Sequence, residues 1–247
     1  MWPIPALEHK LVSVLFFPDA LVCCWMSSFA PSFAKSFGGH SKASADRVLT
    51  VRAYKRYSLD NLELTDLIIF NPTVIKKYIS SFLSEHNLCD AFIIFSLHGP
   101  AITEKCIAMP TSTPHYTDFN MTKNERNTKW EYRYLYAHDG HFVFYVYYVP
   151  RSLLLQYQLL AMSAQCNVIK MSTHTAGLLS AYEYMFGKAF RRSQLAVDMM
   201  RTHNKIDTLI SVDALHRMIN IGTDIDVAQE RSYLAAAVGI WNLERIV

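Results

Sequence analysis

Residues 194–220 read QLAVDMMRTHNKIDTLISVDALHRMIN, two short apolar runs separated by a polar segment. The runs at 195–197 and 207–212 have the length and composition of strands, and the polar residues 201–205 have the composition of a turn. We therefore predict a hairpin late in the chain, with Asp198 at the end of its first strand.

Asp198 is in a position that phosphate-handling folds use. There, a carboxylate at a strand end faces a metal ion or an attacking water, while the amides of the following turn face the phosphate. Here Met199 and Met200 follow the acid, and no glycine lets the backbone approach a phosphate. The pattern predicts either a working nucleotide site or the remnant of one.

Composition narrows the classes of function. The chain has 247 residues and a formal charge of +3, without a dense basic block, so nucleic acid is not an expected partner. Its five cysteines include no Cys-x-x-Cys pair, which disfavours a disulfide framework or a zinc knuckle and favours a reducing, cytoplasmic compartment. We expect no signal peptide and no membrane-spanning segment, so any membrane association would go through a partner.

Outward from the late hairpin, strands and helices alternate. Pro18-Asp19 and Asp139-Gly140 are turn signals between apolar runs, and Asn71-Pro72 is a helix start with Asn71 as its cap. The pattern predicts strands at 11–17, 20–26, 48–57, 91–97, 102–109, 130–136, 142–149 and 168–171, and helices at 72–85, 152–165, 175–186 and 226–241. This is an α/β chain with hairpins near both ends, an order similar to that of the two lobes of the actin-like superfamily.

Several motifs sharpen this similarity. The run YSLDNLELTDL at 57–67, the strand before His98-Gly99-Pro100, CIAMP at 106–110 and SYLAAAVGI at 232–240 resemble PilM-type proteins. These are actin-like, FtsA-related components of type IV pilus and related secretion machines. The resemblance implies a first ribonuclease-H-like lobe at 1–110, a small inserted α/β lobe at 111–190, and a reduced second lobe at 191–247 that ends in a helix.

The resemblance also shows where nucleotide-binding residues are missing. The family's first turn carries Asp-Ile-Gly and a hydroxyl residue, whereas this chain reads LFFPDA at 15–20. In the second turn Met200 replaces the expected glycine, so Asp198 and Thr202 are the residues left to hold a nucleotide. We therefore expect a degenerate site and a pseudo-ATPase, with neither ATP nor Mg as a required cofactor.

The resemblance further implies a cytoplasmic scaffold in a pilus, type II secretion or DNA-uptake machine. In PilM-type proteins a groove between the first lobe and the inserted lobe receives the cytoplasmic tail of a single-span, PilN-like protein, which tethers the scaffold beneath the inner membrane. Parts of 97–109 and 142–160 would line that groove here. Whether the chain forms a homo-oligomer is left open.

Two competing interpretations assign an enzymatic activity to the chain. An active ATPase would use Asp198, and an unrelated α/β metal-dependent hydrolase would use His138, Asp139 and His141, whose imidazoles and carboxylate are suitable metal ligands. The simpler interpretation of these three residues is an exposed hairpin turn. His98, at a strand end, is interpreted as a loop histidine, and Cys23 and Cys24 as core packing.

Overall fold

The computed structural model describes residues 10–28, 49–115, 127–186, 210–221 and 225–243. Its centre is a six-stranded sheet in the order β10-β6-β1-β2-β3-β11. The first three strands form an antiparallel meander, β6 and β10 run parallel to β1, and β11 runs parallel to β3. The strands are β1 (Leu11–Phe17), β2 (Ala20–Ser28), β3 (Leu49–Ser58), β6 (Phe92–Leu97), β10 (Asn167–Thr173) and β11 (Ile219–Ile221).

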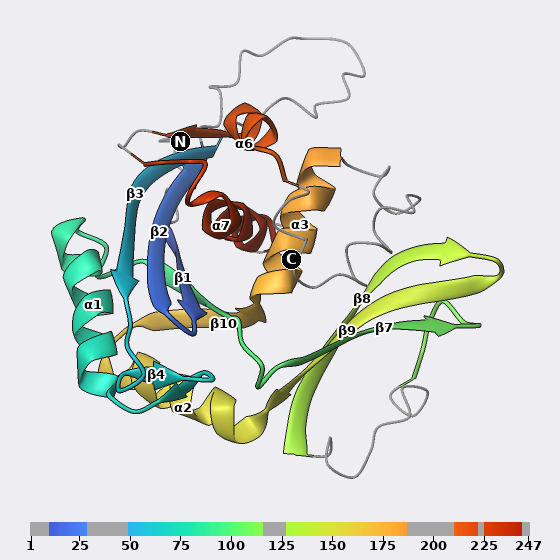
Figure 1. Ribbon diagram of the computed structural model, residues 1–247, viewed down its shortest axis with the longest axis horizontal. Helices are drawn as coiled ribbons and strands as arrows, with labels where there is room; N and C mark the ends of the chain where they lie inside the picture. Colours follow the sequence, from blue (N-terminus) through green and yellow to red (C-terminus); the bar gives the residue numbers. More distant parts are fainter. Residues whose placement is uncertain (1–9, 29–48, 116–126, 187–209, 222–224, 244–247) are drawn as a thin grey trace, which may run out of the picture.

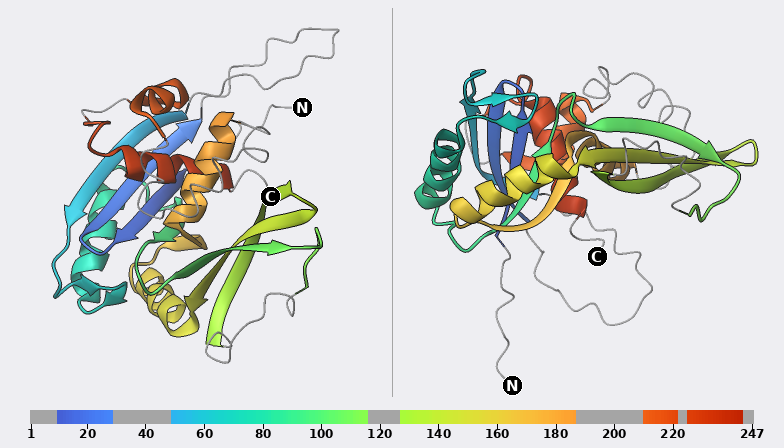
Figure 2. Two further views of the ribbon diagram at one scale, coloured as in Figure 1. Left: turned by 45° about the vertical axis from the view of Figure 1, so that its right-hand side comes forward. Right: turned by 90° about the horizontal axis from the view of Figure 1, so that it is seen from below.

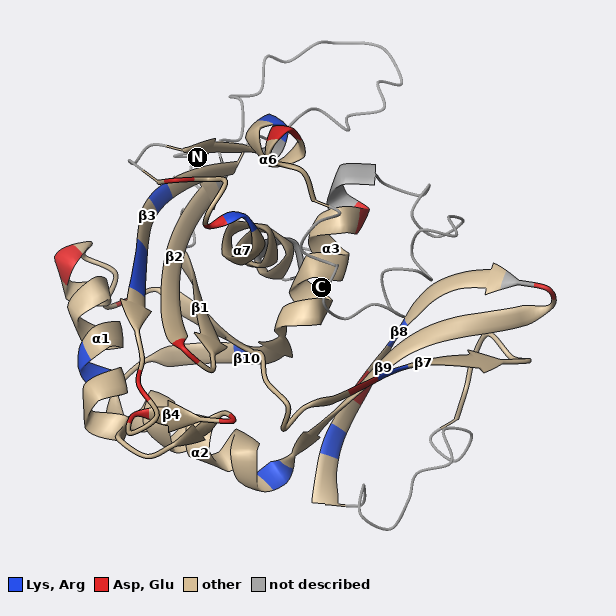
Figure 3. Cartoon of the chain, viewed as in Figure 1, with Lys and Arg blue, Asp and Glu red and all other residues tan. Residues whose placement is uncertain are grey.

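Helices cover both faces of this sheet (Figure 1). One face carries α1 (Pro72–Glu85) and α2 (Arg151–Ser163), and the other carries α3 (His174–Phe186) and α7 (Arg231–Leu243). This double cover explains why β1 is buried along its whole length and contains no charged residue, as Figure 3 also shows. The side chain of Asn71 caps α1 by accepting a hydrogen bond from the Val74 amide at 3.3 Å, as predicted.

A second, three-stranded sheet projects from the main body (Figure 2). Its order is β7-β9-β8, from β7 (Thr103–Met109), β8 (Thr128–His138) and β9 (His141–Pro150). Asp139 and Gly140 have φ angles of 47° and 74°, so they form the left-handed two-residue turn that the Asp-Gly pair predicts. A short hairpin, β4 (Leu64–Thr65) and β5 (Ile68–Ile69), precedes α1.

Most of the predicted elements are confirmed, with small differences in their bounds. The boundaries at 110 and 190 stay predictions, but β10, which they assign to the inserted lobe, pairs with β6 of the main sheet. Likewise β11, from the range 191–247, pairs with β3. In the sequence, the projecting sheet and α2 (Arg151–Ser163) therefore fall between β6 and β10, two strands that are neighbours in the main sheet. This placement decides where the site forms.

Three predictions were wrong in detail. The strand predicted at 207–212 does not extend to Val212, because Ser211 caps a helix, α6 (Val212–Met218), by accepting from the Ala214 amide at 3.1 Å. The last helix begins at Arg231 because Asp226 closes a separate turn, accepting from the Ala228 and Gln229 amides at 3.0 and 3.2 Å. The strand predicted at 130–136 is too short, because β8 already begins at Thr128 and extends to His138. The first strand of the late hairpin lies outside the described residues.

Candidate functional site

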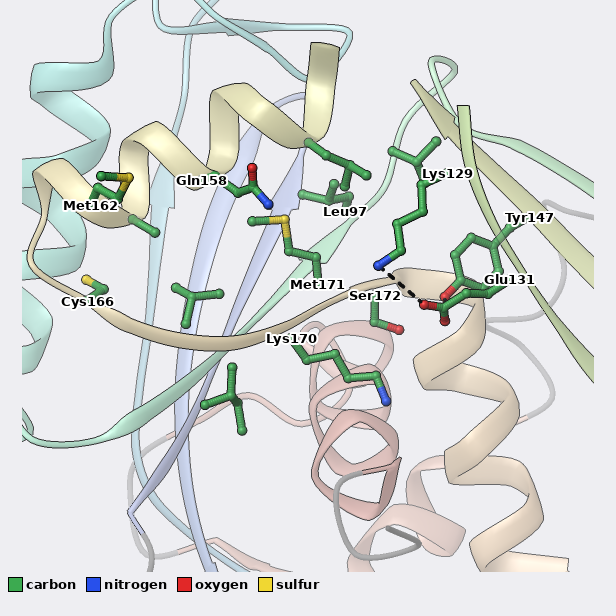
Figure 4. Close-up of a pocket in the computed structure, with 15 residues that line it drawn as sticks. Leu97, Lys129, Glu131, Tyr147, Gln158, Met162, Cys166, Lys170, Met171 and Ser172 are labelled. Atoms are coloured by element: carbon green, nitrogen blue, oxygen red, sulfur yellow. Dashed lines mark hydrogen bonds and ion pairs between the residues drawn. The ribbon is translucent and has the colours of Figure 1, made fainter. Parts of the chain in front are cut away.

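A hollow of about 530 Å³ lies between the main sheet, α2 and the projecting sheet (Figure 4). Leu97, Tyr147, Val149, Leu154 and Gln158 come from the two ranges predicted to line a groove. The remaining lining residues are Lys129 and Glu131 from β8, Ala161 and Met162 from α2, Cys166 before β10, and residues 168–172 of β10. A groove at the predicted place is therefore present, and β10 forms a wall that was not predicted.

The β10 wall offers backbone groups as well as side chains. Five consecutive residues of this strand line the hollow. Because side chains of a strand point alternately to its two faces, a run of consecutive lining residues means that the strand's edge borders the space. Among the described strands β10 is the end strand of its sheet, with β6 on its other side. Its outer edge is therefore placed to accept a further strand.

The two ends of the groove differ in chemistry. Met162 and Cys166 lie at one end, whereas Lys129, Glu131 and Tyr147 lie together at the other (Figure 4). Lys129 Nζ is 3.9 Å from Glu131 Oε1, and the Tyr147 hydroxyl donates to Glu131 Oε2. Burial, and then the Glu131 charge, raise the pKa of Tyr147 well above its usual range. The hydroxyl therefore stays protonated and holds the Glu131 carboxylate in place.

A hydrogen-bonded cluster joins the projecting sheet to the main body beside the groove. The Tyr145 hydroxyl donates to Glu104 Oε1 at 2.6 Å and lies 3.0 Å from Thr173 Oγ1. Thr175 Oγ1 donates to the second oxygen of Glu104 at 2.8 Å, and the Ala176 amide donates to Thr173 Oγ1 at 3.2 Å. Burial and the neighbouring carboxylate raise the pKa of Tyr145. Since β7, β9, β10 and α3 all contribute, the cluster fixes the distance between the groove's two walls.

Aromatic rings gather where β1, β6 and β10 end. The Phe17 ring centroid lies 4.8 Å from that of His174, 4.5 Å from that of Tyr233 and 5.4 Å from that of His98. Asp19, in the first turn, pairs with Arg56 at 3.8 Å. The carboxyl ends of parallel strands are where open α/β sheets usually bind ligands. In this chain, side chains with bulky rings meet at that place.

The structure describes some of the other predicted site residues and leaves two of them out. Asp198 and Thr202 lie outside the described residues. Asp139 and His141 lie at the β8–β9 turn, where His141 Nδ1 is 3.0 Å from the Asp139 carbonyl oxygen. The described part of the chain contains no group of three metal-ligating side chains. Cys23 and Cys24 are buried in the core, as predicted, and burial raises the pKa of Cys24 to about 12.

Sequence reasoning did not find Lys129, Lys170, Glu104 and Thr173. Lys129 lies just before the strand predicted at 130–136, because the polar residues that precede it show no alternation. Thr173 and Glu104 are 69 positions apart and share the Tyr145 hydroxyl only because β10 joins the main sheet next to β6. The Tyr-rich pattern of β9 was the one available signal, since a buried tyrosine needs a hydrogen-bond partner.

Solved structures identify the fold. No protein-family model matches the chain, and no curated protein matches it. The chain is similar to a chain of a PilM-PilN type IV pilus biogenesis complex, with a TM-score of 0.52, 10% identity, and coverage of 71% of this chain and 51% of that one. The chain has an actin-like α/β fold. This confirms the fold class that the resemblance implied.

Two weaker matches accompany it. One is the cytoplasmic domain of EpsL, an inner-membrane component of the type II secretion system of Vibrio cholerae, with a TM-score of 0.39, 7% identity and coverage of 68% and 57%. The other is a Bacteroides thetaiotaomicron protein with an actin-like ATPase fold, with a TM-score of 0.36, 9% identity and coverage of 74% and 59%. The chain thus spans between half and three fifths of the matched chains. None of the described helices is long and apolar enough to cross a membrane.

Proposed function

We propose that this protein is a cytoplasmic scaffold of a type IV pilus or related secretion machine, which captures the tail of a PilN-like membrane protein in the groove. The observation that carries the proposal is the hollow of about 530 Å³ bordered by the outer edge of β10. The similarity to a chain of a PilM-PilN complex supports it. The tail would hold the protein at the inner membrane, so that its membrane association is peripheral.

The groove suits an extended peptide. A tail strand next to β10 would form backbone hydrogen bonds, and its alternate side chains would point to the two faces of the extended sheet. Apolar side chains would lie near Leu154, Met162 and Val168, each contributing about 1.5–3 kcal/mol when fully buried. Two or three such anchors supply about 3–9 kcal/mol, and micromolar affinity corresponds to about 8 kcal/mol. The backbone hydrogen bonds of the added strand must therefore offset the cost of ordering the tail.

The polar end would fix the direction of the peptide. Among the described residues that line the groove, Lys129 and Lys170 are accompanied by one carboxylate, Glu131, which accepts a hydrogen bond from Tyr147. An acidic side chain of the tail would therefore find a favourable place at this end rather than among the apolar residues. We infer that the tail combines apolar residues at alternate positions with an acid beyond them.

The scaffold proposal includes loss of ATPase activity. The first turn offers no glycine, serine, threonine or lysine to a phosphate, and Phe17 at its start packs against His174 and Tyr233. A pseudo-ATPase that needs no bound ATP or Mg fits these residues better than a nucleotide-driven enzyme.

Titration calorimetry tests the proposal with two ligands. We expect a synthetic tail peptide from the candidate single-span partner to bind in the micromolar range, and ATP with Mg to give no heat of binding. Met171→Asp, which places a charge in the apolar part of the groove, should weaken peptide binding at least about tenfold. Lys170→Glu provides a second groove variant that changes no buried apolar group.

Leu62→Asp is the matched control, because Leu62 is 79% exposed in the turn before β4 and does not line the groove. Its peptide affinity should equal that of the wild type. Circular dichroism melting would establish that each variant is folded. Peptide binding that both groove variants leave unchanged would refute capture in this groove, and micromolar ATP binding would refute the pseudo-ATPase part.

A further inference from the structure

The outer face of α2 carries an exposed apolar stripe. Leu155, Leu159 and Met162 are 54%, 56% and 73% exposed, and their spacing of four and then three residues places them in one line along the helix. The opposite face of α2 packs into the core through Leu153, Tyr157, Leu160 and Ala161. A helix that is apolar on its solvent face as well as its buried face indicates a binding surface.

A second hollow, of about 410 Å³, runs along one side of this stripe. Ile69, Pro72 and Lys76 form its far side, and Gln156 and Leu159 form its near side. Its shape is fixed by the Gln156 side chain, whose Oε1 accepts a hydrogen bond from the Ile69 amide at 3.2 Å. Ile68 and Phe70, 46% and 60% exposed, extend the apolar surface beyond it. The stripe and this hollow together are called the α2 ridge below.

The charges at the α2 ridge indicate the sign of the charge that a partner carries there. Lys76 is the one charged side chain among the described residues that line the hollow. Pro72 and Thr73, at the amino end of α1, line it too, and the first turn of that helix contains no acidic residue. The helix dipole and Lys76 therefore both favour a carboxylate here.

The same charges argue against two other occupants. Two copies of α2 packed against each other would bring no carboxylate to Lys76, because the helix reads RSLLLQYQLLAMS and contains no acid. An anionic bilayer is broad and flat, so it would meet Asp60, Glu63 and Asp66, around β4, as well as Lys76; Figure 3 shows acidic residues there. A single helix along α2 can instead place its acid at Lys76 alone.

We propose that the α2 ridge binds an acidic amphipathic helix of a partner protein. Apolar residues of that helix at spacings of three and four would lie against Leu155, Leu159 and Met162, and an acid on its flank would pair with Lys76. A partner helix of about 13 residues, about 20 Å long, would match the length of α2. This docking surface is separate from the tail-binding groove, with which it shares only Met162, and goes beyond the proposed function.

A designed peptide tests the proposal without knowledge of the natural partner. The probe is a fluorescein-labelled helix of about 14 residues with leucines along one face and glutamates along one flank, and its matched version carries lysines instead. Fluorescence anisotropy with the full chain should show the acidic probe binding at least about tenfold more tightly than the basic one. Leu159→Ser and Lys76→Glu should each weaken binding of the acidic probe about fivefold or more.

Leu62→Ser, in the turn before β4, is the control variant and should bind the acidic probe like the wild type. Met171→Asp in the groove should also bind the probe normally, so failure of this proposal and failure of tail capture give different results. Equal binding of the acidic and basic probes, or binding that Leu159→Ser does not change, would overturn the proposal.

Two further measurements identify the alternative occupants. Self-association in sedimentation equilibrium that Leu159→Ser abolishes would assign the surface to a second copy. Flotation with vesicles of about three parts phosphatidylcholine to one part phosphatidylglycerol, lost in the same variant, would assign it to a membrane. Either result, without a preference for the acidic probe, overturns the proposal of a partner helix.

Discussion

Replacement of Gly239 by alanine should destabilise the protein severely, because α3 and α7 cross there in backbone contact. A Cβ atom at Gly239 would lie 1.6 Å from the Gly177 carbonyl oxygen, 2.5 Å from the Gly177 carbonyl carbon and 2.7 Å from the Ala181 amide nitrogen. All three atoms belong to the backbone of α3, so no side chain can rotate away to make room. The two helices would have to separate.

The geometry gives the size of the effect. Ordinary van der Waals contact needs well over 3 Å, so the helices must move apart by about 1.5 Å at the crossing and lose close packing among buried alanines. Overpacking costs about 1–3 kcal/mol where side chains can adjust, and more where only the backbone can move. Alanine gains about 1 kcal/mol over glycine from helix propensity. We expect a net loss of about 3 kcal/mol or more in the free energy of unfolding.

Gly177 provides the matched control on the other helix. A Cβ atom there would lie 3.0 Å from the Ala236 carbonyl oxygen and 3.2 Å from Ile240 Cγ1, so shifts of a few tenths of an ångström suffice. The cost then roughly cancels the gain in helix propensity, and Gly177→Ala should stay within about 1 kcal/mol of the wild type. Urea unfolding followed by circular dichroism measures both variants. Equal stability of Gly239→Ala and the wild type would show that the helices do not cross at backbone contact.

Other predictions concern single side chains. Tyr145→Phe removes a hydrogen bond to the Glu104 carboxylate and should lower the free energy of unfolding by about 1–3 kcal/mol. It should also weaken tail-peptide binding in calorimetry. If both quantities stay unchanged, Tyr145 does not hold the groove walls. Because burial raises the pKa of Cys24 from 9.0 to about 12, its neutral thiol stabilises the fold fully below pH 9, and this contribution is lost as pH rises toward 12. The loss in the free energy of unfolding is at most about 4 kcal/mol. Cys24→Ala should therefore make the free energy of unfolding in urea less dependent on pH between 9 and 12. An equal change with pH in the variant and the wild type would contradict this. Asp198→Ala should leave the affinity for the tail peptide within about twofold, whereas a nucleotide-gated protein would change its affinity when ATP is added.

Local signals predicted most of the fold. Pro18-Asp19, Asp139-Gly140 and Asn71-Pro72 act through their own backbone preferences and immediate neighbours, and each appears in the structure as expected. The strand at 168–171 was also predicted, but the strand with which it pairs was not. That pairing depends on contacts between residues 75 positions apart in the chain, such as Asn167 and Phe92. Sequence periodicity contains no such information.

The groove was predicted only in part for the same reason. Its lining at Leu97 and in β9 followed from the resemblance, whereas residues 168–172 lie there because β10 extends the main sheet on the side toward α2. The start of α6 was missed because an apolar run that ends in Ser-Val matches a strand as well as a helix. Only the hydrogen bond from the Ala214 amide to Ser211 decides between them.

The ring cluster at the end of β1 shows what occupies the strand ends beside a first turn that has no glycine, serine, threonine or lysine. In a nucleotide-binding protein a flexible glycine turn and a charged ligand would occupy the carboxyl ends of these strands. Here Phe17 packs edge-on against both His174, at the start of α3, and Tyr233, in the first turn of α7. Its ring therefore joins the two helices whose crossing at Gly177 and Gly239 supports the sheet. A Phe17→Gly change would not open the strand ends to a phosphate, since His174 and Tyr233 would still lie there and the contact between the helices would be weakened.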